Sequence, residues 1–155
     1  MTLYCWSAWY PLESDGELKE LMPECPGIYE IRINREFSRL NGATRIVNIG
    51  RAANLKERVW GQKACKFSED ASGAMKWLKE KEDPVFEARW FALSNSEEAQ
   101  NAEDQRLAEF IVKFWELPPG QPKGPRYVGT DTGCKDLIDP TKNNNYIDLS
   151  RECVG

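Results

Sequence analysis

Alternating apolar and polar residues predict three β-strands in this chain. The clearest run is Gly27–Ile33, in which residues of opposite character alternate and β-branched residues recur. Thr44–Ile49 and Val85–Leu93 are two further runs rich in β-branched or aromatic residues. Because the turn dipeptide Asn41-Gly42 lies between the first two runs, we expect them to pair as an antiparallel hairpin with a long connection.

Apolar positions at helical spacing predict four helices around these strands. The longest is Glu97–Trp115, for which Ser94 and Ser96 are candidate caps and Pro118-Pro119-Gly120 is the stop signal. The aromatic-rich segment 1–11 is expected to pack on the domain as a short strand. The tail 121–155 is rich in Gly, Pro, Asn and Asp and is expected to be irregular. The other expected helices are Glu17–Leu21, Ala52–Trp60 and Asp70–Lys81.

Together these elements predict a small α/β domain of the α+β type, built on a three-stranded antiparallel sheet flanked by helices. A length of 155 residues suits a single domain with one core. We expect an aromatic-rich segment with a short helix packed on the domain (1–22), the main domain (23–121) and an irregular tail (122–155). The tryptophans expected in the core are Trp6, Trp9, Trp77, Trp90 and Trp115.

The chain contains no histidine. This excludes a Ser-His-Asp triad, a Cys-His dyad, a histidine-bearing zinc site and an imidazole pH switch within the chain. Any general base must therefore be a carboxylate, a Tyr, a Lys or a metal-bound water.

The five cysteines are spread along the chain and never form a CxxC pair, which disfavours a zinc ribbon or a thioredoxin-type redox site. The N-terminus shows no signal-peptide pattern, and no apolar run approaches the ~18–20 residues that span a bilayer. We therefore expect a reduced cytoplasmic protein without membrane association. The cysteines expected as free buried thiols are Cys5, Cys25, Cys65, Cys134 and Cys153.

A basic segment stands out against the net charge of −4. Between Arg32 and Lys66 there are nine lysines and arginines but two glutamates, an excess of seven positive charges. Such a local excess can attract a polyanion although the whole chain is acidic. A solvated face with scattered arginines is the alternative that the charge count leaves open.

Three short motifs fall on the predicted hairpin and on the helix that follows it. They are Pro26-Gly27-Ile28-Tyr29, Val47-Asn48-Ile49-Gly50, and the run from Asn54-Leu55 to Arg58, which lies ten residues beyond position 48. This set resembles the GIY-YIG nuclease domain, in which GIY lies on the first strand, YIG or YVG on the second, and a helix then carries an Arg. The resemblance covers residues 23–121 and implies a GIY-YIG-like fold.

The resemblance also implies roles for individual residues in phosphodiester hydrolysis. Tyr29 would orient or deprotonate water, and Arg58 would clamp the phosphate through its planar guanidinium. Glu103 on the long helix would hold Mg²⁺ or Mn²⁺, which stabilises the leaving oxygen. Glu109 is the runner-up as metal ligand, because its distance to Pro118 suits some family members. This chemistry needs no histidine.

Further basic residues would contact the nucleic acid. Arg51 directly follows the second motif, where the family often has a basic residue, and is a candidate phosphate contact. Lys56, Lys63 and Lys66 would extend a DNA-facing surface or serve as ordinary solubilising charges.

Two positions depart from the family pattern. Asn48 stands where the family has its second Tyr, and Asn can hold water or phosphate by hydrogen bonds but cannot act as a base. Gln121 is the nearest match to an Asn that often follows the last Pro of the family.

A second Tyr-Val-Gly at 127–129 has no Arg ten residues later, and we interpret it as a chance match.

The sequence therefore predicts a metal-dependent endonuclease that hydrolyses DNA phosphodiester bonds. The alternative is a catalytically impaired nucleic-acid-binding or protein-interaction module on the same scaffold, which Asn48 favours. No separate recognition module is evident, so sequence specificity would need the tail, a homodimer or a partner protein.

Overall fold

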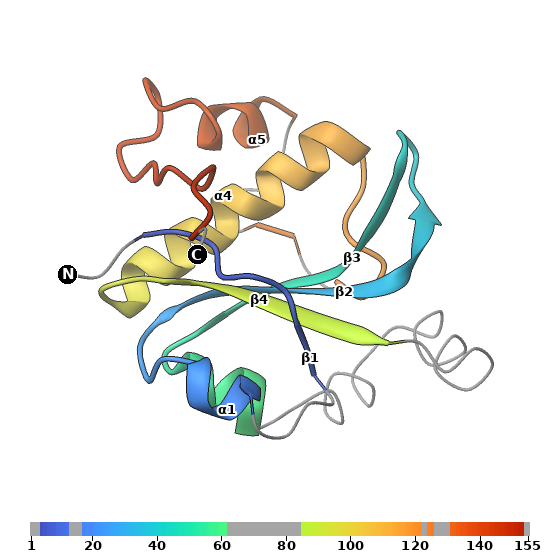
Figure 1. The fold of residues 1–155 in the computed structure, drawn as a ribbon. Coiled ribbons are helices and arrows are strands. Elements are labelled where there is room, and N and C mark those ends of the chain that lie inside the picture. The colour runs from blue at the N-terminus through green and yellow to red at the C-terminus, as the bar shows by residue number, and fades with distance from the viewer. Residues whose placement is uncertain (1–3, 13–16, 62–84, 122–123, 126–130, 154–155) are drawn as a thin grey trace.

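The computed structural model describes residues 4–12, 17–61, 85–121, 124–125 and 131–153. These residues form an α+β fold in which a four-stranded antiparallel sheet is flanked by helices (Figure 1). The strand order is β1-β4-β2-β3, so that β3 is an edge strand. The elements are β1 (Tyr10–Pro11), α1 (Glu17–Leu21), β2 (Gly27–Ser38), β3 (Ala43–Ala52), η1 (Lys56–Gly61), β4 (Phe86–Ala92), α4 (Ser96–Phe114) and α5 (Asp131–Leu137).

The three predicted strands are confirmed as β2, β3 and β4, but the expected count of three is wrong because the N-terminal segment adds β1. Tyr10 pairs with Ala88 and Pro11 with Glu87, and the Leu12 N–H donates to the Phe86 carbonyl at 2.9 Å. Pro is tolerated in β1 because an edge strand leaves one row of backbone groups without a sheet partner. The short strand expected within residues 1–11 is thus present, and it protects the outer edge of β4.

The two faces of the sheet carry different helices. In Figure 1, α1 lies on one side of the sheet and α4 with α5 on the other. Cross-strand partners share a face, so Tyr29 lies beside Gly50 and Trp90, in a core cluster with residues of α1 and η1. Ile28 lies on the opposite face with Phe91, in a cluster with Ala99 and Ala102 of α4.

The long predicted helix is confirmed as α4, but both of its ends differ from the expectation. The N-cap is Asn95 rather than Ser94 or Ser96. Its Oδ1 accepts from the Glu98 N–H at 2.8 Å, and its Nδ2 donates to the Glu98 carboxylate at 3.1 Å. The Asn95 carboxamide thus supplies both the acceptor and the donor of this mutual bonding.

Trp115 follows α4 in the left-handed region, with φ 65°, and its N–H donates to the Ile111 carbonyl at 2.8 Å. Its side chain is 63% exposed, so its expected place in the core is wrong: the left-handed cap turns the chain away from the helix face that packs on the sheet. Trp6 and Trp90 are buried as predicted, and Trp9 is half-buried. Trp77 lies outside the described residues.

Two other helix predictions need correction. The helix expected from Ala52 begins later, as the π-helical turn η1, because Ala52 still pairs with Gly27 in the sheet. The tail is not wholly irregular, since it contains α5. The short helix over Glu17–Leu21 is confirmed as α1. The helix expected over Asp70–Lys81 lies outside the described residues.

A disulfide between Cys5 and Cys153 joins the two ends of the chain, which corrects the expectation that both are free thiols. The Trp6 N–H donates to the Arg151 carbonyl at 2.8 Å, and the Cys153 N–H donates to the Trp6 carbonyl at 2.7 Å. This pairing holds the two Cα atoms 5.2 Å apart, a normal disulfide spacing. Cys25 and Cys134 are free thiols as expected, although only Cys134 is buried, and Cys65 lies outside the described residues.

A buried ionic network links the sheet to α4. Glu30 is fully buried on β2, where its carboxylate lies 2.7 Å from Arg89 Nε and 2.8 Å from Arg106 Nε. The Arg89 guanidinium also lies over the rings of Trp6 and Trp9. A buried carboxylate is tolerated only when it is paired in this way.

None of the described helices has the length and apolar character needed to cross a bilayer.

Candidate functional site

Tyr29 and Arg58, two of the residues in the predicted motifs, come together beside the edge strand β3. A Cβ added at Gly50 would lie 2.4 Å from the Tyr29 hydroxyl oxygen and 2.4 Å from Cζ. A larger residue at position 50 would therefore require the tyrosine ring to move from its place across β3. The ring is buried, and its hydroxyl accepts a hydrogen bond from Arg58 Nε at 3.4 Å. Arg58 is an exposed residue of η1, so the buried tyrosine contacts an arginine at the protein surface.

Asn48 lies beside a β-bulge in β3. Ile31 pairs with Asn48 but Arg32 pairs with Ile46, so Val47 is the extra residue in the edge strand. Bulges redirect side chains and are frequent next to active sites. The turn after α4 docks along this edge, because the Gly120 N–H donates to the Val47 carbonyl at 2.7 Å.

The Asn48 carboxamide is bonded to that same turn. Its Nδ2 donates to the Gly120 carbonyl at 3.3 Å and to Gln121 Oε1 at 3.2 Å. Gln121 Oε1 also accepts from the Ile49 N–H at 3.0 Å. Gln121 thus accepts from a backbone N–H of the edge strand that a further strand could otherwise bind. It also contacts Asn48, the residue that stands where the GIY-YIG motif has its second Tyr.

Arg51 and Glu103 form a second polar pair at the end of β3. Arg51 Nε lies 3.6 Å from Glu103 Oε1, with the arginine side chain 48% and the glutamate side chain 18% exposed. Arg51 is the cross-strand partner of Ile28, so this pair lies on the α4 face, opposite to Tyr29 and Arg58. The two pairs are thus linked to consecutive residues of the edge strand: Tyr29 contacts Gly50, and Arg51 itself pairs with Glu103.

Glu109, the runner-up as metal ligand, faces a different part of the molecule. Its carboxylate lies 3.8 Å from Arg106 and accepts from Gln105 Nε2 at 3.5 Å. Burial raises the pKa of the Glu109 carboxyl, and the Arg106 guanidinium partly opposes this shift. The Glu109 charge also acts on Tyr146, so Glu109 lies against the C-terminal tail. The structure therefore groups Glu109 with the tail, and Glu103 with Arg51.

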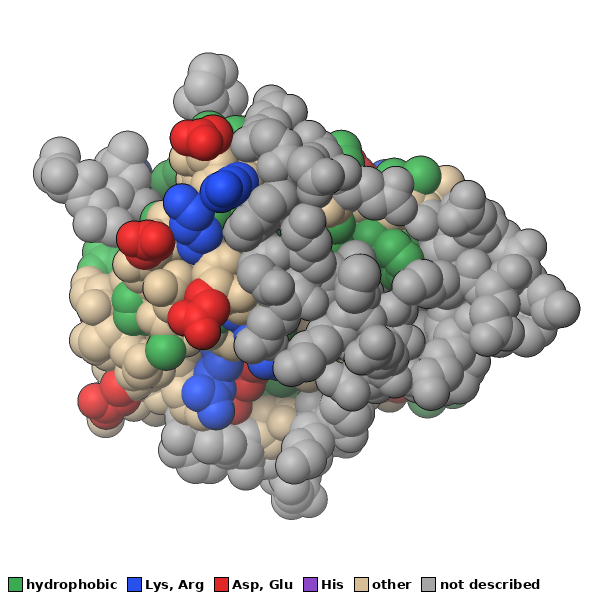
Figure 2. Space-filling view, turned by 90° about the horizontal axis from the view of Figure 1, so that it is seen from below, with side chains coloured by type: hydrophobic (Ala, Val, Ile, Leu, Met, Phe, Trp, Pro, Cys, Tyr) green, Lys and Arg blue, Asp and Glu red, His purple; other side chains and the backbone are tan. Residues whose placement is uncertain are grey.

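The basic segment is distributed over the fold and paired with glutamates from other elements. Arg32 and Arg45 both pair with Glu87 of β4, at 2.9 and 3.6 Å. Arg39 pairs with Glu116 at 2.5 Å. Figure 2 views the side on which α1 lies, and basic and acidic side chains are interspersed over its described part. The local charge excess therefore does not form a continuous basic surface on that part of the face.

The remaining predicted contacts are only partly described. Lys56 is half-buried on η1. Lys63 and Lys66, and the Tyr-Val-Gly at 127–129, lie outside the described residues.

The donor set suits a weakly held divalent ion better than a self-sufficient metal centre. Within the described ranges, no group of three or more carboxylate or cysteine ligands is gathered that could hold a metal ion. Mg²⁺, however, is often bound by one or two carboxylates together with waters and substrate phosphates. Glu103 fits that mode, since one partly exposed carboxylate stands near the edge of the sheet.

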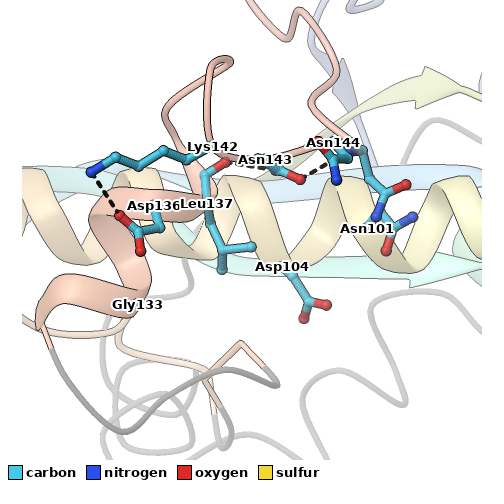
Figure 3. Close-up of a pocket in the computed structure, with 9 residues that line it drawn as sticks. Asn101, Asp104, Gly133, Asp136, Leu137, Lys142, Asn143 and Asn144 are labelled. Carbon is cyan, nitrogen blue, oxygen red and sulfur yellow. Dashed lines mark hydrogen bonds and ion pairs between the residues drawn. The ribbon is translucent and has the colours of Figure 1, made fainter.

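A separate pocket lies on the outer side of α4, between that helix, α5 and the segment 143–145 (Figure 3). Its volume is about 340 Å³, and most of the residues that line it are of polar type. Asp136 pairs with Lys142 at 3.5 Å, and Asn143 Nδ2 donates to the Leu137 carbonyl at 2.7 Å. Because α4 separates this pocket from the sheet, it is not part of the arrangement at the β3 edge.

Comparison with models of protein families, with curated proteins and with solved structures finds no match for this chain. The likeness to GIY-YIG nucleases therefore stands on the residues of this chain alone, at positions 27–29, 48–50, 58 and 103. Of these, Tyr29, Gly50 and Arg58 lie in one contact set.

Proposed function

We propose that this protein is a metal-dependent endonuclease of GIY-YIG type, with its site at the β3 edge. The observation that carries the proposal is the bond between Tyr29 and Arg58, which the shape of Gly50 permits. A phenol and an arginine held together at an accessible edge suit the binding of a phosphodiester. If Tyr29 served only to fill the core, its hydroxyl would have no reason to extend past Gly50 to the exposed residue Arg58.

Each side chain has a role that follows from its contacts. Arg58 donates from Nε to the Tyr29 hydroxyl, and the planar fork of its guanidinium would bind two oxygens of the phosphate. The tyrosine hydroxyl would orient or deprotonate the attacking water. Glu103 would hold Mg²⁺ or Mn²⁺, and the bound ion would supply stabilisation of the leaving oxygen. Arg51, now paired with Glu103, would turn to a phosphate of the bound strand.

Substitution of Glu103 by Gln is expected to lower the nicking of supercoiled plasmid in Mg²⁺ by about a hundredfold, because the metal would lose the carboxylate proposed to hold it. The fold should be retained, since a half-exposed ion pair such as Arg51–Glu103 is worth about 1 kcal/mol or less. The measurement is the initial rate of nicking, with thermal unfolding as a check of the fold.

Glu97→Gln is the matched control, because Glu97 is an exposed carboxylate on the first turn of the same helix. It should nick at the wild-type rate. Equal rates for wild type and Glu103→Gln would remove Glu103 from the mechanism.

The second candidate function is a nucleic-acid-binding or protein-interaction module without catalysis. Asn48 favours it, because Asn cannot replace a tyrosine as a base. The neutralised arginines also favour it over a strongly basic nuclease surface. Salt-sensitive DNA binding without cleavage would support this module, and affinity independent of salt would exclude nucleic acid as the partner.

We retain DNA as the proposed substrate and the cytoplasm as the proposed location. A homodimer or a partner protein would supply sequence specificity. In a reducing cytoplasm, the pair Cys5 and Cys153 would be kept as thiols. An intact disulfide in protein isolated with its thiols blocked would therefore overturn that location.

A further inference from the structure

The hydrogen bonds around Asn48 determine which way its carboxamide faces. The Ile49 N–H is a donor, so the Gln121 atom 3.0 Å away must be the amide oxygen. That oxygen and the Gly120 carbonyl are both acceptors, so the Asn48 atom facing them must be Nδ2. The two N–H groups of Asn48 are thus both committed to the turn after α4.

The remaining polar atom of Asn48 is its carbonyl oxygen. Within the described part of the chain, no donor is bonded to Asn48 Oδ1, and the side chain is partly exposed. Asn48 therefore offers an acceptor and has no N–H left for a phosphate oxygen. An acceptor of this kind can bind a water proton but cannot bind a phosphate anion.

The position of Asn48 matches that role. Residues 48 and 50 of β3 pair with Ile31 and Tyr29, so they lie on the same face of the sheet. Two residues along a strand are about 7 Å apart. Since the Tyr29 hydroxyl lies against Gly50, the phenol and Asn48 belong to neighbouring positions on the same face of β3.

We propose that Gln121 is a positioning residue, which fixes the Asn48 carboxamide so that Oδ1 accepts a hydrogen bond from the attacking water. The proposal rests on the nuclease function proposed above. Asn48 then orients the water, in place of a second tyrosine, and Gln121 acts through Asn48 without touching the substrate. The turn Pro118–Gln121 is held to β3 by its own backbone bond from Gly120 to Val47, so the amide contact is additional to the docking of the turn.

Two variants of Gln121 separate positioning from structure. Gln121→Glu keeps an acceptor for Asn48 Nδ2 and the Ile49 N–H, and it should keep kcat within about threefold of wild type. Gln121→Met has similar length but no acceptor oxygen, so the Asn48 amide is free to turn. We expect kcat to fall between about tenfold and a hundredfold with KM for plasmid unchanged, because misplacing a reacting group costs up to about a hundredfold. A merely structural role would lower both variants' stability and leave kcat per folded molecule unchanged.

Nuclear magnetic resonance of the Asn48 side-chain amide tests the orientation without any need for cleavage. The two amide protons, assigned by their loss in Asn48→Ala, should exchange slowly with solvent in wild type and in Gln121→Glu but rapidly in Gln121→Met. Rapid exchange in wild type would overturn the orientation. Wild-type kcat in Gln121→Met, or equal falls in both variants, would overturn the positioning role.

The two proposals fail in different ways. A wild-type protein that does not cut DNA would end the nuclease proposal and the water role with it, while the amide exchange would still report the orientation. A protein that cuts DNA but is indifferent to Gln121→Met would leave the nuclease proposal intact and remove Gln121 from it.

Discussion

Substitution of Arg58 by Ala is expected to slow the nicking of supercoiled plasmid by about a hundredfold or more, with the fold intact. Arg58 is an exposed residue whose Nε donates to the Tyr29 hydroxyl at 3.4 Å, and its guanidinium would neutralise the charge that grows on the phosphoryl oxygens. Removing an exposed side chain leaves no cavity in the core, so the thermal unfolding midpoint should change little. The measurement is the single-turnover nicking rate in Mg²⁺.

Arg58→Lys and Glu57→Ala are the matched controls. Lys keeps the positive charge but loses the planar fork, so its rate should lie between those of wild type and Arg58→Ala. Glu57 is exposed on the same π-helical turn and should be dispensable. Wild-type nicking by Arg58→Ala would rule out the phosphate clamp.

Opening the Cys5–Cys153 disulfide is expected to give the largest loss of stability. The bond closes a separation of 148 residues, and in the chain-entropy model a loop of that size stabilises the fold by about 5 kcal/mol. For a chain of this length, that corresponds to a fall in the unfolding midpoint on the order of 10–20 °C. Thermal unfolding with and without a thiol reductant measures the difference.

Two serine variants sharpen this experiment. Cys5→Ser with Cys153→Ser should unfold at the low midpoint and show no response to the reductant. Cys25→Ser should keep the full response, because Cys25 is a free thiol. An oxidised wild-type protein whose midpoint does not change on reduction would contradict the assigned role of the bond.

The central hairpin and the long helix could be predicted because their signals are local. The helical spacing of Leu107 and Phe110 reflects the burial of one face of α4, as predicted. The alternation in Gly27–Ile33 predicted a strand, which β2 confirms, although both faces of this segment are buried. The joining of Cys5 to Cys153, and the pairing of Tyr10 with Ala88, depend on partners far along the chain. No local pattern carries such information.

The candidate site was predictable to a similar degree. The spacing between position 48 and Arg58 singled out a residue that donates a hydrogen bond to Tyr29 in the structure, but the contact itself was not predicted. The basic segment was misleading because counting charges along the sequence omits distant partners, such as Glu87 and Glu116. Gln121 was noted for its place after the prolines, but its bond to Asn48 depends on how the turn docks against a bulged strand.

A double-mutant cycle of Tyr29→Phe and Arg58→Ala, measured by single-turnover nicking of supercoiled plasmid in Mg²⁺, tests the central claim most directly. If the two residues act as one site, the effects are non-additive. We predict that the double variant is no slower than Arg58→Ala alone, within about threefold. Rate losses that multiply in the double variant, or a wild-type protein that does not nick the plasmid, would contradict the account.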